Sequence, residues 1–376
     1  MSLFSLALET LSGLTPKQEA MLKELRKPKV FVGLSGGVDS SVAAYLLKKQ
    51  GYDVVGIHLR CWNKDGCNIA DAEDARRVAE VLDIPFYVLN LEEDYKLSVV
   101  DYMVNGYADG FTPNPDVMCN KEIKFGLFLK KALELGADYI ATGHYVKLGK
   151  YGKEFVIEAA RDKAKDQSYF LWTLGQYELS HSLFPIGDYL KSEVRRIAEH
   201  AKLPTAQKKD SQGLCFIGKV RMRDFLGEYL PVKRGKVLSV TGETLGEHEG
   251  NYFYTIGQRH GIKISGNKPY YVISKDALTN TLVLGDEEEI KTTRTKLVKL
   301  NSTNLVLKNQ HKNQKGIEVY ARLRYRQPLS KAILVEGQEG SLELVFDRPQ
   351  KFVTPGQSAV FYSPKGEMLG GGVITV

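Results

Sequence analysis

The stretch VFVGLSGGVDSSVAAYLL, residues 30–47, decides the fold. Its first five residues form a short apolar run rich in β-branched side chains, which is typical of a buried strand. Apolar residues then recur at helical spacing up to Leu47, and Gly51 follows as a predicted C-cap. The order strand, glycine turn, helix places unpaired backbone N–H groups and the positive end of a helix dipole at residues 35–37. The sequence therefore predicts an anion site at this turn.

The turn has no lysine of its own. A Walker A loop needs a lysine after its last glycine to reach the terminal phosphates, and here Val38, Asp39 and two serines follow Gly37. The Rossmann pattern G-x-G-x-x-G is also absent, so a capped βα turn without a ligand stays open on these residues alone. The string S-G-G-x-D-S resembles the PP-loop signature of ATP pyrophosphatases. This resemblance implies that the turn holds a leaving pyrophosphate instead of a transferring γ-phosphate.

Strands alternate with helices through the first half of the chain. Predicted strands at 53–59, 86–90 and 138–142, each separated by helical patterns, indicate an α/β fold with a doubly wound parallel sheet. Ligands of such sheets bind at the carboxyl ends of the strands. From about residue 220, short strands between glycine, proline and threonine turns predict a small β-rich domain and then a β-barrel.

This change in the pattern of predicted elements divides the chain into four segments. We expect an N-terminal extension containing a helix at residues 1–28 and a nucleotide-binding catalytic domain at 29–218. A central β-rich domain is expected at 219–290 and a C-terminal β-barrel at 291–376.

Charge and composition narrow the class of protein. Residues 291–376 hold 14 lysines and arginines against 6 aspartates and glutamates, while the whole chain has 52 against 45. A basic excess at one end favours a polyanionic partner. No apolar run approaches the roughly 18 residues of a membrane span, and we expect no signal or transit peptide. The 4 cysteines form no C-x-x-C pair, so we expect a cytoplasmic chain without a disulfide framework.

Two cysteines lie in segments suited to chemistry, whereas Cys61 and Cys67 are expected not to be metal ligands. Cys119, in TPNPDVMCNKEIKFG (residues 112–126), is predicted at the start of a helix beside two lysines, which would ease ionisation of its thiol. Asp116, three residues earlier, is a candidate acid or base. Cys215 lies in the glycine-containing segment KKDSQGLCFIG (208–218), which could bring it to Cys119.

Over residues 29–376 the chain resembles the tRNA-specific 2-thiouridylases. The resemblance rests on strings that occur in the same order, namely SGGVDSS (35–41), TPNPDVMCNKEIKFG (112–126), ATGHY (141–145), KDQSYFLWTL (165–174), KKDSQGLCFIG (208–218), TIGQRHGI (255–262), RYRQ (324–327) and TPGQSAVFY (354–362). This family makes 2-thiouridine at the wobble position of certain tRNAs.

The resemblance implies roles for individual residues. ATP would be bound by the phosphate turn and two further positions, namely Gly33, Leu34, Ser35, Gly36, Gly37, Val38, Asp39, Ser40, Leu59 and Gly143. Asn114, Pro115 and Asp116 would meet the flipped target uridine. Cys119 would be the nucleophile and Cys215 the persulfide carrier. Contacts to tRNA would come from His144, Lys165, Asp166, Gln167, Arg324, Tyr325 and Gln357.

The implied partners and cofactors follow the same chemistry. Replacing a pyrimidine oxygen by sulfur requires adenylation of that oxygen, a persulfide as sulfur source and a second thiol to release the product, which leaves a Cys119–Cys215 disulfide. We therefore expect ATP with Mg²⁺, tRNA, a persulfide donor or relay protein and no membrane, and a monomer or weak oligomer. The wobble base must be extruded into a pocket.

A basic platform for the tRNA body is predicted from the string ARLRYRQ. Strand alternation would place Arg322, Arg324 and Arg326 on one face, although charged residues on a strand also protect an ordinary sheet edge.

Three other functions stay open. A PP-loop amidating synthetase would use ammonia or an amine as nucleophile and would not depend on either Cys119 or Cys215. A thiolating enzyme could instead hold an iron–sulfur cluster on Asp116, Cys119 and Cys215. A non-enzymatic RNA-binding protein would tolerate changes at Asp39 and Ser40.

Overall fold

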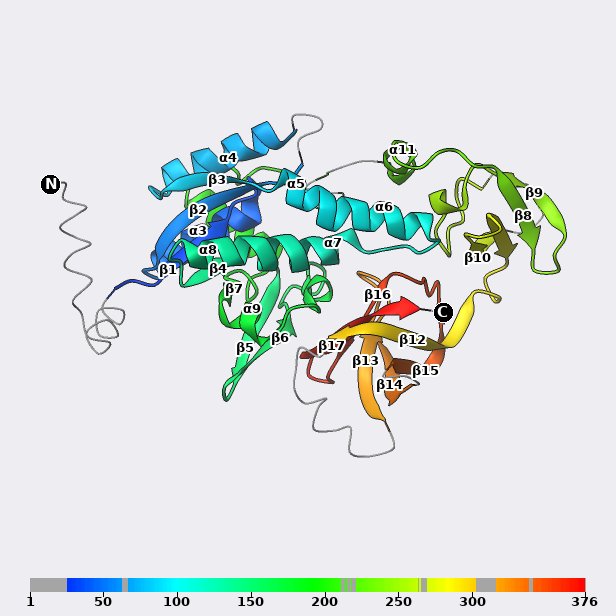
Figure 1. Cartoon of the computed structure of the whole chain (residues 1–376). Helices are drawn as coiled ribbons and strands as arrows, with labels where there is room; N and C mark the ends of the chain where they lie inside the picture. The colour runs from blue at the N-terminus through cyan, green and yellow to red at the C-terminus, as the bar shows by residue number, and fades with distance from the viewer. Residues whose placement is uncertain are drawn as a thin grey trace.

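The structure, a computed structural model, describes residues 26–62, 67–210, 213, 215, 217, 221–262, 264, 269–301, 316–337 and 341–375. Three units follow one another along the chain: a parallel sheet with helices, a small sheet and a closed barrel (Figure 1). The helix predicted within residues 1–28 falls almost wholly outside the described residues, and so does the strand expected at NLVLKN, residues 304–309.

The first unit contains a five-stranded parallel sheet of order β3-β2-β1-β4-β7. Its strands are β1 (Lys29–Gly33), β2 (Asp53–Arg60), β3 (Phe86–Asn90), β4 (Tyr139–Ala141) and β7 (Ser182–Leu183). A hairpin of β5 (Val146–Tyr151) and β6 (Glu154–Ala159) follows β4. The predicted doubly wound α/β architecture is confirmed, with each predicted strand of the sheet in place.

Helices cover the sheet on both sides because successive strand residues point to opposite faces. Val30 and Val32 pack in one buried cluster, and Phe31 packs in the other. The first cluster includes side chains of α3 (Val38–Lys49), α4 (Cys67–Val81) and α10 (Lys191–His200). The second includes side chains of two long helical segments described next.

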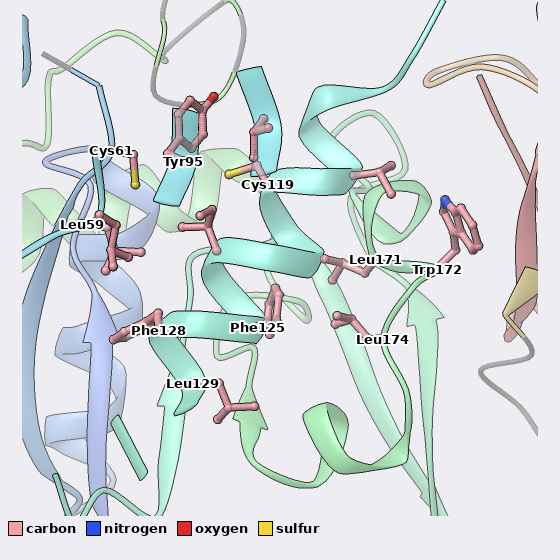
Figure 2. Close-up of a cluster of buried hydrophobic side chains, with 14 of the residues drawn as sticks. Leu59, Cys61, Tyr95, Cys119, Phe125, Phe128, Leu129, Leu171, Trp172 and Leu174 are labelled. Atoms are coloured by element: carbon pink, nitrogen blue, oxygen red, sulfur yellow. The ribbon is translucent and has the colours of Figure 1, made fainter. Parts of the chain in front are cut away.

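Each long helical segment contains a stretch of π-helix. The first runs through α5 (Glu92–Tyr95), η1 (Lys96–Val100) and α6 (Asp101–Ala108). The second runs through α7 (Pro115–Met118), η2 (Cys119–Phe128) and α8 (Leu129–Glu134). Shorter helices are η3 (Ser168–Leu171) and α9 (Gln176–Ser180). Figure 2 shows η2 side chains such as Phe125 and Phe128 within the buried cluster.

Two helix starts differ from the sequence prediction. The apolar face that begins at Ala72 predicts a helix from about Asp71, but helix α4 begins earlier, at Cys67. The second long segment begins at Pro115 and not near Asn120, because the Asn114 side chain accepts a hydrogen bond from the Val117 amide and proline fits the first helical position. Cys119 therefore lies beyond the first helical turn.

The second unit follows α11 (Met222–Gly227) and is a four-stranded sheet of order β10-β11-β8-β9. Its elements are β8 (Gly235–Ser239), β9 (Thr244–His248), η4 (Asn251–Phe253), β10 (Tyr271–Asp276) and β11 (Thr281–Gly285). Strand β11 pairs parallel with β8, and the other pairs are antiparallel. The predicted β-rich unit after the catalytic region is confirmed.

The third unit is a closed six-stranded antiparallel barrel of order β12-β15-β14-β13-β16-β17. Its strands are β12 (Lys291–Asn301), β13 (Ile317–Arg322), β14 (Ser330–Glu336), β15 (Leu342–Lys351), β16 (Ser358–Tyr362) and β17 (Met368–Thr375). This confirms the predicted barrel. Strand β13 ends at Arg322, so the expectation that Arg322, Arg324 and Arg326 share one strand face is wrong.

The barrel packs directly against the parallel-sheet unit. The Trp172 indole N–H donates to Ser358 Oγ over 3.0 Å, and the Tyr169 hydroxyl donates to the Ser358 carbonyl over 2.9 Å. Gly371 of β17 lies against Trp172, where an added Cβ would stand 2.7 Å from the ring. These buried contacts join the last strands of the barrel to the segment after β6.

Candidate active site

The phosphate turn joins β1 to α3 at the carboxyl end of the sheet. Gly36 has a φ of +72°, and an added Cβ would collide with the backbone carbonyl of Asp71 in α4. Gly37 is the N-cap of α3 without a side chain to occupy the helix end. The Ser40 hydroxyl donates to the Gly37 carbonyl, and the Ser35 amide donates to Ser40 Oγ over 3.2 Å. The turn is therefore a glycine and serine cradle at a helix N-terminus, as an anion site requires.

Gly143 closes on this turn from the segment after β4. An added Cβ at Gly143 would stand 2.6 Å from the Ser40 amide nitrogen, so only glycine permits the observed contact. Gly33 and Leu59 lie at the carboxyl ends of β1 and β2, and Leu34 follows β1 directly. Both leucine side chains are buried, so nothing but their backbone could face a nucleotide. The structure thus brings Gly33, Leu34 and Gly143 to the phosphate turn, whereas Leu59 lies on β2 two residues past Ile57, the partner of Gly33.

Asp39, in the first turn of α3, is held by two side chains that the sequence reasoning missed. The Tyr145 hydroxyl donates to Asp39 Oδ1 over 2.7 Å. The Lys191 ammonium donates to both carboxylate oxygens, over 2.7 and 2.8 Å. Lys191 begins α10 and is distant in sequence, so no local pattern at the turn could reveal this contact.

Cys119 and Cys215 meet on the other side of the sheet. Their sulfur atoms lie 3.5 Å apart, with the Cys119 thiol as hydrogen-bond donor. The Asp116 carboxylate accepts a hydrogen bond from the Cys215 amide over 3.0 Å, and the Tyr95 hydroxyl donates to the Cys215 carbonyl over 2.6 Å. Figure 2 shows the Cys119 sulfur beside Tyr95 in the buried cluster, near Cys61. The predicted approach of the two cysteines is therefore observed.

The two thiols differ in acidity, and the sequence expectation for Cys119 is wrong. Cys119 is fully buried beyond the first turn of its helix, and burial raises its pKa well above the usual value. The pKa of Cys215 falls to about 7, because it accepts the hydrogen bond of Cys119 and lies near the Lys124 ammonium. Burial opposes the charge on Lys124, but the cysteines and Asp116 raise the pKa of that lysine. Cys215 is thus the ionised thiol of the pair.

Asp116 combines burial with hydrogen bonding. Burial raises the pKa of its carboxyl group, against the opposing effects of the Cys215 amide and Lys124. Such a carboxyl group can carry a proton nearer neutral pH than an exposed aspartate can. Asn114 caps the helix, and Pro115 is buried at its first position. The three predicted target-base residues therefore form one rigid helix start beside the thiols.

The predicted tRNA contacts gather where the barrel meets the first unit. Gln357 donates to the carbonyl of Thr112 over 2.8 Å, and the Tyr325 ring packs on Phe170 with centroids 4.4 Å apart. The Asp166 carboxylate is buried and pairs with Arg322 over 3.3 Å. Gln357 thus joins Thr112 and Pro113 to the barrel, while Tyr325 and Asp166 join the barrel to the segment after β6.

Other predicted tRNA residues are also engaged within the chain. Gln167 accepts a hydrogen bond from the Tyr145 amide, and Lys165 pairs with Asp210 over 2.6 Å. His144 is buried against Thr142, and burial and then the charge of Lys124 hold its pKa well below the usual value. Arg324 lies outside the strand and donates to the Ile256 carbonyl and to Thr354 Oγ1.

Among the described residues, no group of three or more histidine, cysteine, aspartate or glutamate side chains could hold a metal ion. The Lys124 ammonium lies beside the two thiols, where an iron–sulfur cluster would need ligands that donate electron pairs. This arrangement therefore gives no support to the iron–sulfur alternative. The described residues also contain no helix long and apolar enough to cross a membrane.

Comparisons with known proteins cover almost the whole chain. Residues 28–219 match the family model described as a tRNA methyl transferase HUP domain, 223–286 the tRNA methyl transferase PRC-barrel domain, and 296–374 the aminomethyltransferase beta-barrel domain. A tRNA-specific 2-thiouridylase of Geobacillus kaustophilus is 46% identical over 363 residues, covering 94% of this chain and 96% of the relative. One of Streptococcus equi subsp. zooepidemicus is 44% identical over 369 residues, covering 94% and 96%.

Solved structures resemble parts of the chain more distantly. A 4-thiouridine synthetase in complex with RNA and ATP has a TM-score of 0.37 at 19% identity and covers 54% of this chain and 50% of its own. The NMN synthetase of Francisella tularensis has a TM-score of 0.34 at 15% identity, with coverages of 56% and 87%. With the family models and full-length relatives in agreement, the chain belongs to the tRNA-specific 2-thiouridylase family.

Proposed function

We propose that this protein replaces the C2 oxygen of the tRNA wobble uridine with sulfur, using ATP and a cysteine persulfide. The observation that carries the proposal is the thiol pair: two cysteines from distant segments stand 3.5 Å apart, and one has a pKa of about 7. Family membership supplies the substrate class, because the full-length relatives are named tRNA-specific 2-thiouridylases.

In the first step the uridine O2 attacks the α-phosphorus of ATP. The bond between the α- and β-phosphates breaks, and pyrophosphate leaves into the cradle of residues 35–40. The resulting O2-adenylated uridine carries AMP as a good leaving group. Asn114, Pro115 and Asp116 position the extruded base. Of the predicted tRNA contacts, the partly exposed Lys165, Gln167, Tyr325 and Gln357 meet the tRNA in this proposal, whereas His144 and Asp166 are buried and Arg324 is engaged inside the molecule. Mg²⁺ bound to the phosphates would neutralise part of their charge.

In the second step the terminal sulfur of a Cys215 persulfide attacks C2 and expels AMP, which leaves a disulfide between Cys215 and the base. The Cys119 thiolate then attacks the Cys215 sulfur. The C2-bound sulfur leaves as 2-thiouridine, and a Cys119–Cys215 disulfide remains. Asp116 lies beside this pair and accepts the Cys119 proton. A dithiol reductant restores the two thiols, and a persulfide donor or relay protein reloads Cys215.

The test is a reconstituted reaction. The protein is incubated with ATP, Mg²⁺, a persulfide donor and bulk unmodified tRNA, and the nucleosides are analysed by mass spectrometry. We expect 2-thiouridine with stoichiometric AMP and pyrophosphate. An amidated nucleoside formed equally well by the Cys119→Ser and Cys215→Ser variants would replace this proposal with the amidating synthetase. Release of ADP and phosphate would contradict the role of the phosphate turn.

A further inference from the structure

A buried histidine contacts the residue that leads into the phosphate turn. His58 lies near the carboxyl end of β2 and is 3% exposed. The side chains of Ile57 and Leu59 pack in one buried cluster. Strand alternation therefore directs His58 to the opposite face of the sheet, where Leu34 is buried. The His58 Nδ1 atom lies 2.9 Å from the Leu34 carbonyl oxygen. Because a carbonyl oxygen can only accept, Nδ1 carries the ring proton and is the hydrogen-bond donor.

The other ring nitrogen makes His58 costly to bury. Nε2 is buried and has no hydrogen-bond partner among the described residues. Burial lowers the pKa of His58, against the opposing effects of the Leu34 carbonyl and the Asp71 carboxylate, so the ring is neutral near pH 7. A phenyl ring would fill a similar space without an unpaired polar atom. The hydrogen bond to Leu34 is therefore what distinguishes histidine from an apolar ring at this position.

The carbonyl group that His58 contacts belongs to the peptide unit between Leu34 and Ser35. The Leu34 amide donates to the Ile57 carbonyl over 2.7 Å, so β2 contacts both backbone groups of Leu34. The Ser35 amide donates to Ser40 Oγ over 3.2 Å. Because a peptide unit is planar, a hydrogen bond that fixes its carbonyl group also fixes the direction of its N–H group. The start of the cradle is thus oriented from β2.

We propose that His58 is a positioning residue of the pyrophosphate site, whose Nδ1–H group fixes the Leu34–Ser35 peptide unit and so preorganises the cradle of residues 35–40 for pyrophosphate. This inference rests on the proposed use of ATP at that cradle. His58 acts through the backbone of the turn and touches no phosphate itself. A cradle fixed in advance needs no rearrangement when its ligand binds, so loss of the donor should weaken phosphate binding.

A role in packing alone makes the opposite prediction. Asparagine carries its amide nitrogen on Cγ, as histidine carries Nδ1, so His58→Asn keeps a donor for the Leu34 carbonyl but fills less space. His58→Phe keeps the shape of the ring but removes the donor. If shape decides, the phenylalanine variant should bind pyrophosphate more tightly than the asparagine variant does. If the hydrogen bond decides, this order is reversed.

The experiment is calorimetric titration of the full chain, without tRNA, with ATP and with pyrophosphate in the presence of Mg²⁺. His58→Phe should weaken the binding of both ligands by roughly tenfold, the effect of losing a hydrogen bond, and His58→Asn should restore most of this loss. Thermal unfolding confirms that each variant is folded. His58→Leu, which also lacks a donor, replaces the phenylalanine variant if that variant does not fold.

Val54→Ala is the matched control, because Val54 is buried on the same face of the same strand but pairs with Val30, near the other end of β1. We expect this control to lose stability and to bind both ligands like the wild type. Equal affinities of wild type and His58→Phe, or weaker binding by His58→Asn than by His58→Phe, would overturn the inference alone. Wild-type protein that binds neither ATP nor pyrophosphate would overturn the proposed function as well.

Discussion

At the level of single residues, the two thiols of the candidate site differ in acidity, and this difference suits the separate roles that we propose for them. The Cys119 thiol donates a hydrogen bond to Cys215, and the Lys124 ammonium lies near Cys215. Both favour the thiolate form of Cys215. A thiolate is the nucleophile that accepts sulfur from a persulfide. In the proposed reaction the protonated Cys119 acts later, when it releases the product. This division agrees with Cys215 as carrier and Cys119 as the thiol that releases the product.

Sulfur acceptance should follow the ionisation of Cys215. Because the pKa of Cys215 is lowered to about 7, the thiolate fraction and the rate should rise with pH through about 7 and level off above it. Lys124→Met should move this midpoint upward, since a positive charge that favours the thiolate is lost. Persulfide formation is measured by thiol-specific labelling across a range of about two pH units on either side of the midpoint. A rate independent of pH over this range would contradict the prediction.

The two cysteine variants should fail at different steps. Cys215→Ser should accept no sulfur yet still adenylate tRNA, because the phosphate turn lies on a different loop. Cys119→Ser should gain the mass of one sulfur atom on the Cys215 peptide but complete little thiolation unless an external thiol is added. Peptide mass spectrometry after exposure to a persulfide donor makes the comparison. Sulfur found on Cys119 in the wild type, with an active Cys215→Ser enzyme, would reverse the assignment.

At the level of elements, the helix that starts at Pro115 carries Cys119 as well as Pro115 and Asp116, which we propose meet the target base. Its start is set by one cap, in which the Asn114 side chain accepts from the Val117 amide over 3.3 Å. Gln357 fastens the residues just before this cap to the barrel. The position of Cys119 relative to Asp116 therefore depends on a helix end and not on a mobile loop.

Loss of the helix cap should lower the stability of the protein by a measurable amount. Asn114→Ala should lower the free energy of unfolding by about 1 kcal/mol, because the Val117 amide loses its side-chain partner. Asn114→Asp keeps a capping oxygen and should lose much less. Urea unfolding of the two variants beside the wild type gives both values. Equal stability of Asn114→Ala and wild type would show that the cap does not determine where this helix begins.

At the level of the whole molecule, the barrel both completes the active-site region and carries the basic excess. The Asp166–Arg322 pair and the Trp172–Ser358 hydrogen bond tie it to the parallel-sheet unit. Its arginines are not equivalent, because Arg324 is engaged inside the molecule while Arg326 is exposed and lies over the Tyr325 ring. The domain boundaries at 28, 218 and 290 stay a prediction.

This difference predicts how tRNA binding responds to salt. Arg326→Ala should reduce the slope of log affinity against log salt by about one if it contacts a single phosphate, with unchanged stability. Arg324→Ala should lower the melting temperature, because the hydroxyl of Thr354 and the carbonyl of Ile256 lose a charged donor. Filter binding over a salt series and thermal unfolding separate the two effects. An unchanged salt slope for Arg326→Ala would remove that residue from the tRNA surface.

The sequence by itself determined the order of elements and the chemistry of the phosphate turn. Strand and helix periodicity are local properties, so residues 30–47 predicted the first βα unit. Gly36 of the turn has no substitute, because of its positive φ and its close approach to Asp71. The resemblance of several strings to one family predicted the substrate class and the roles of the two cysteines. These inferences needed no contact between distant residues.

The tertiary structure alone decided which thiol is the more acidic and which side chains hold Asp39. The pKa of Cys119 depends on its burial and on Cys215, and both follow from how η2 packs in the core. Lys191 meets Asp39 only because α10 packs beside α3, and strand β13 stops before the arginine string ends. Burial and long-range ion pairs are set by the packing of elements far apart in sequence, and local spacing carries no information about them.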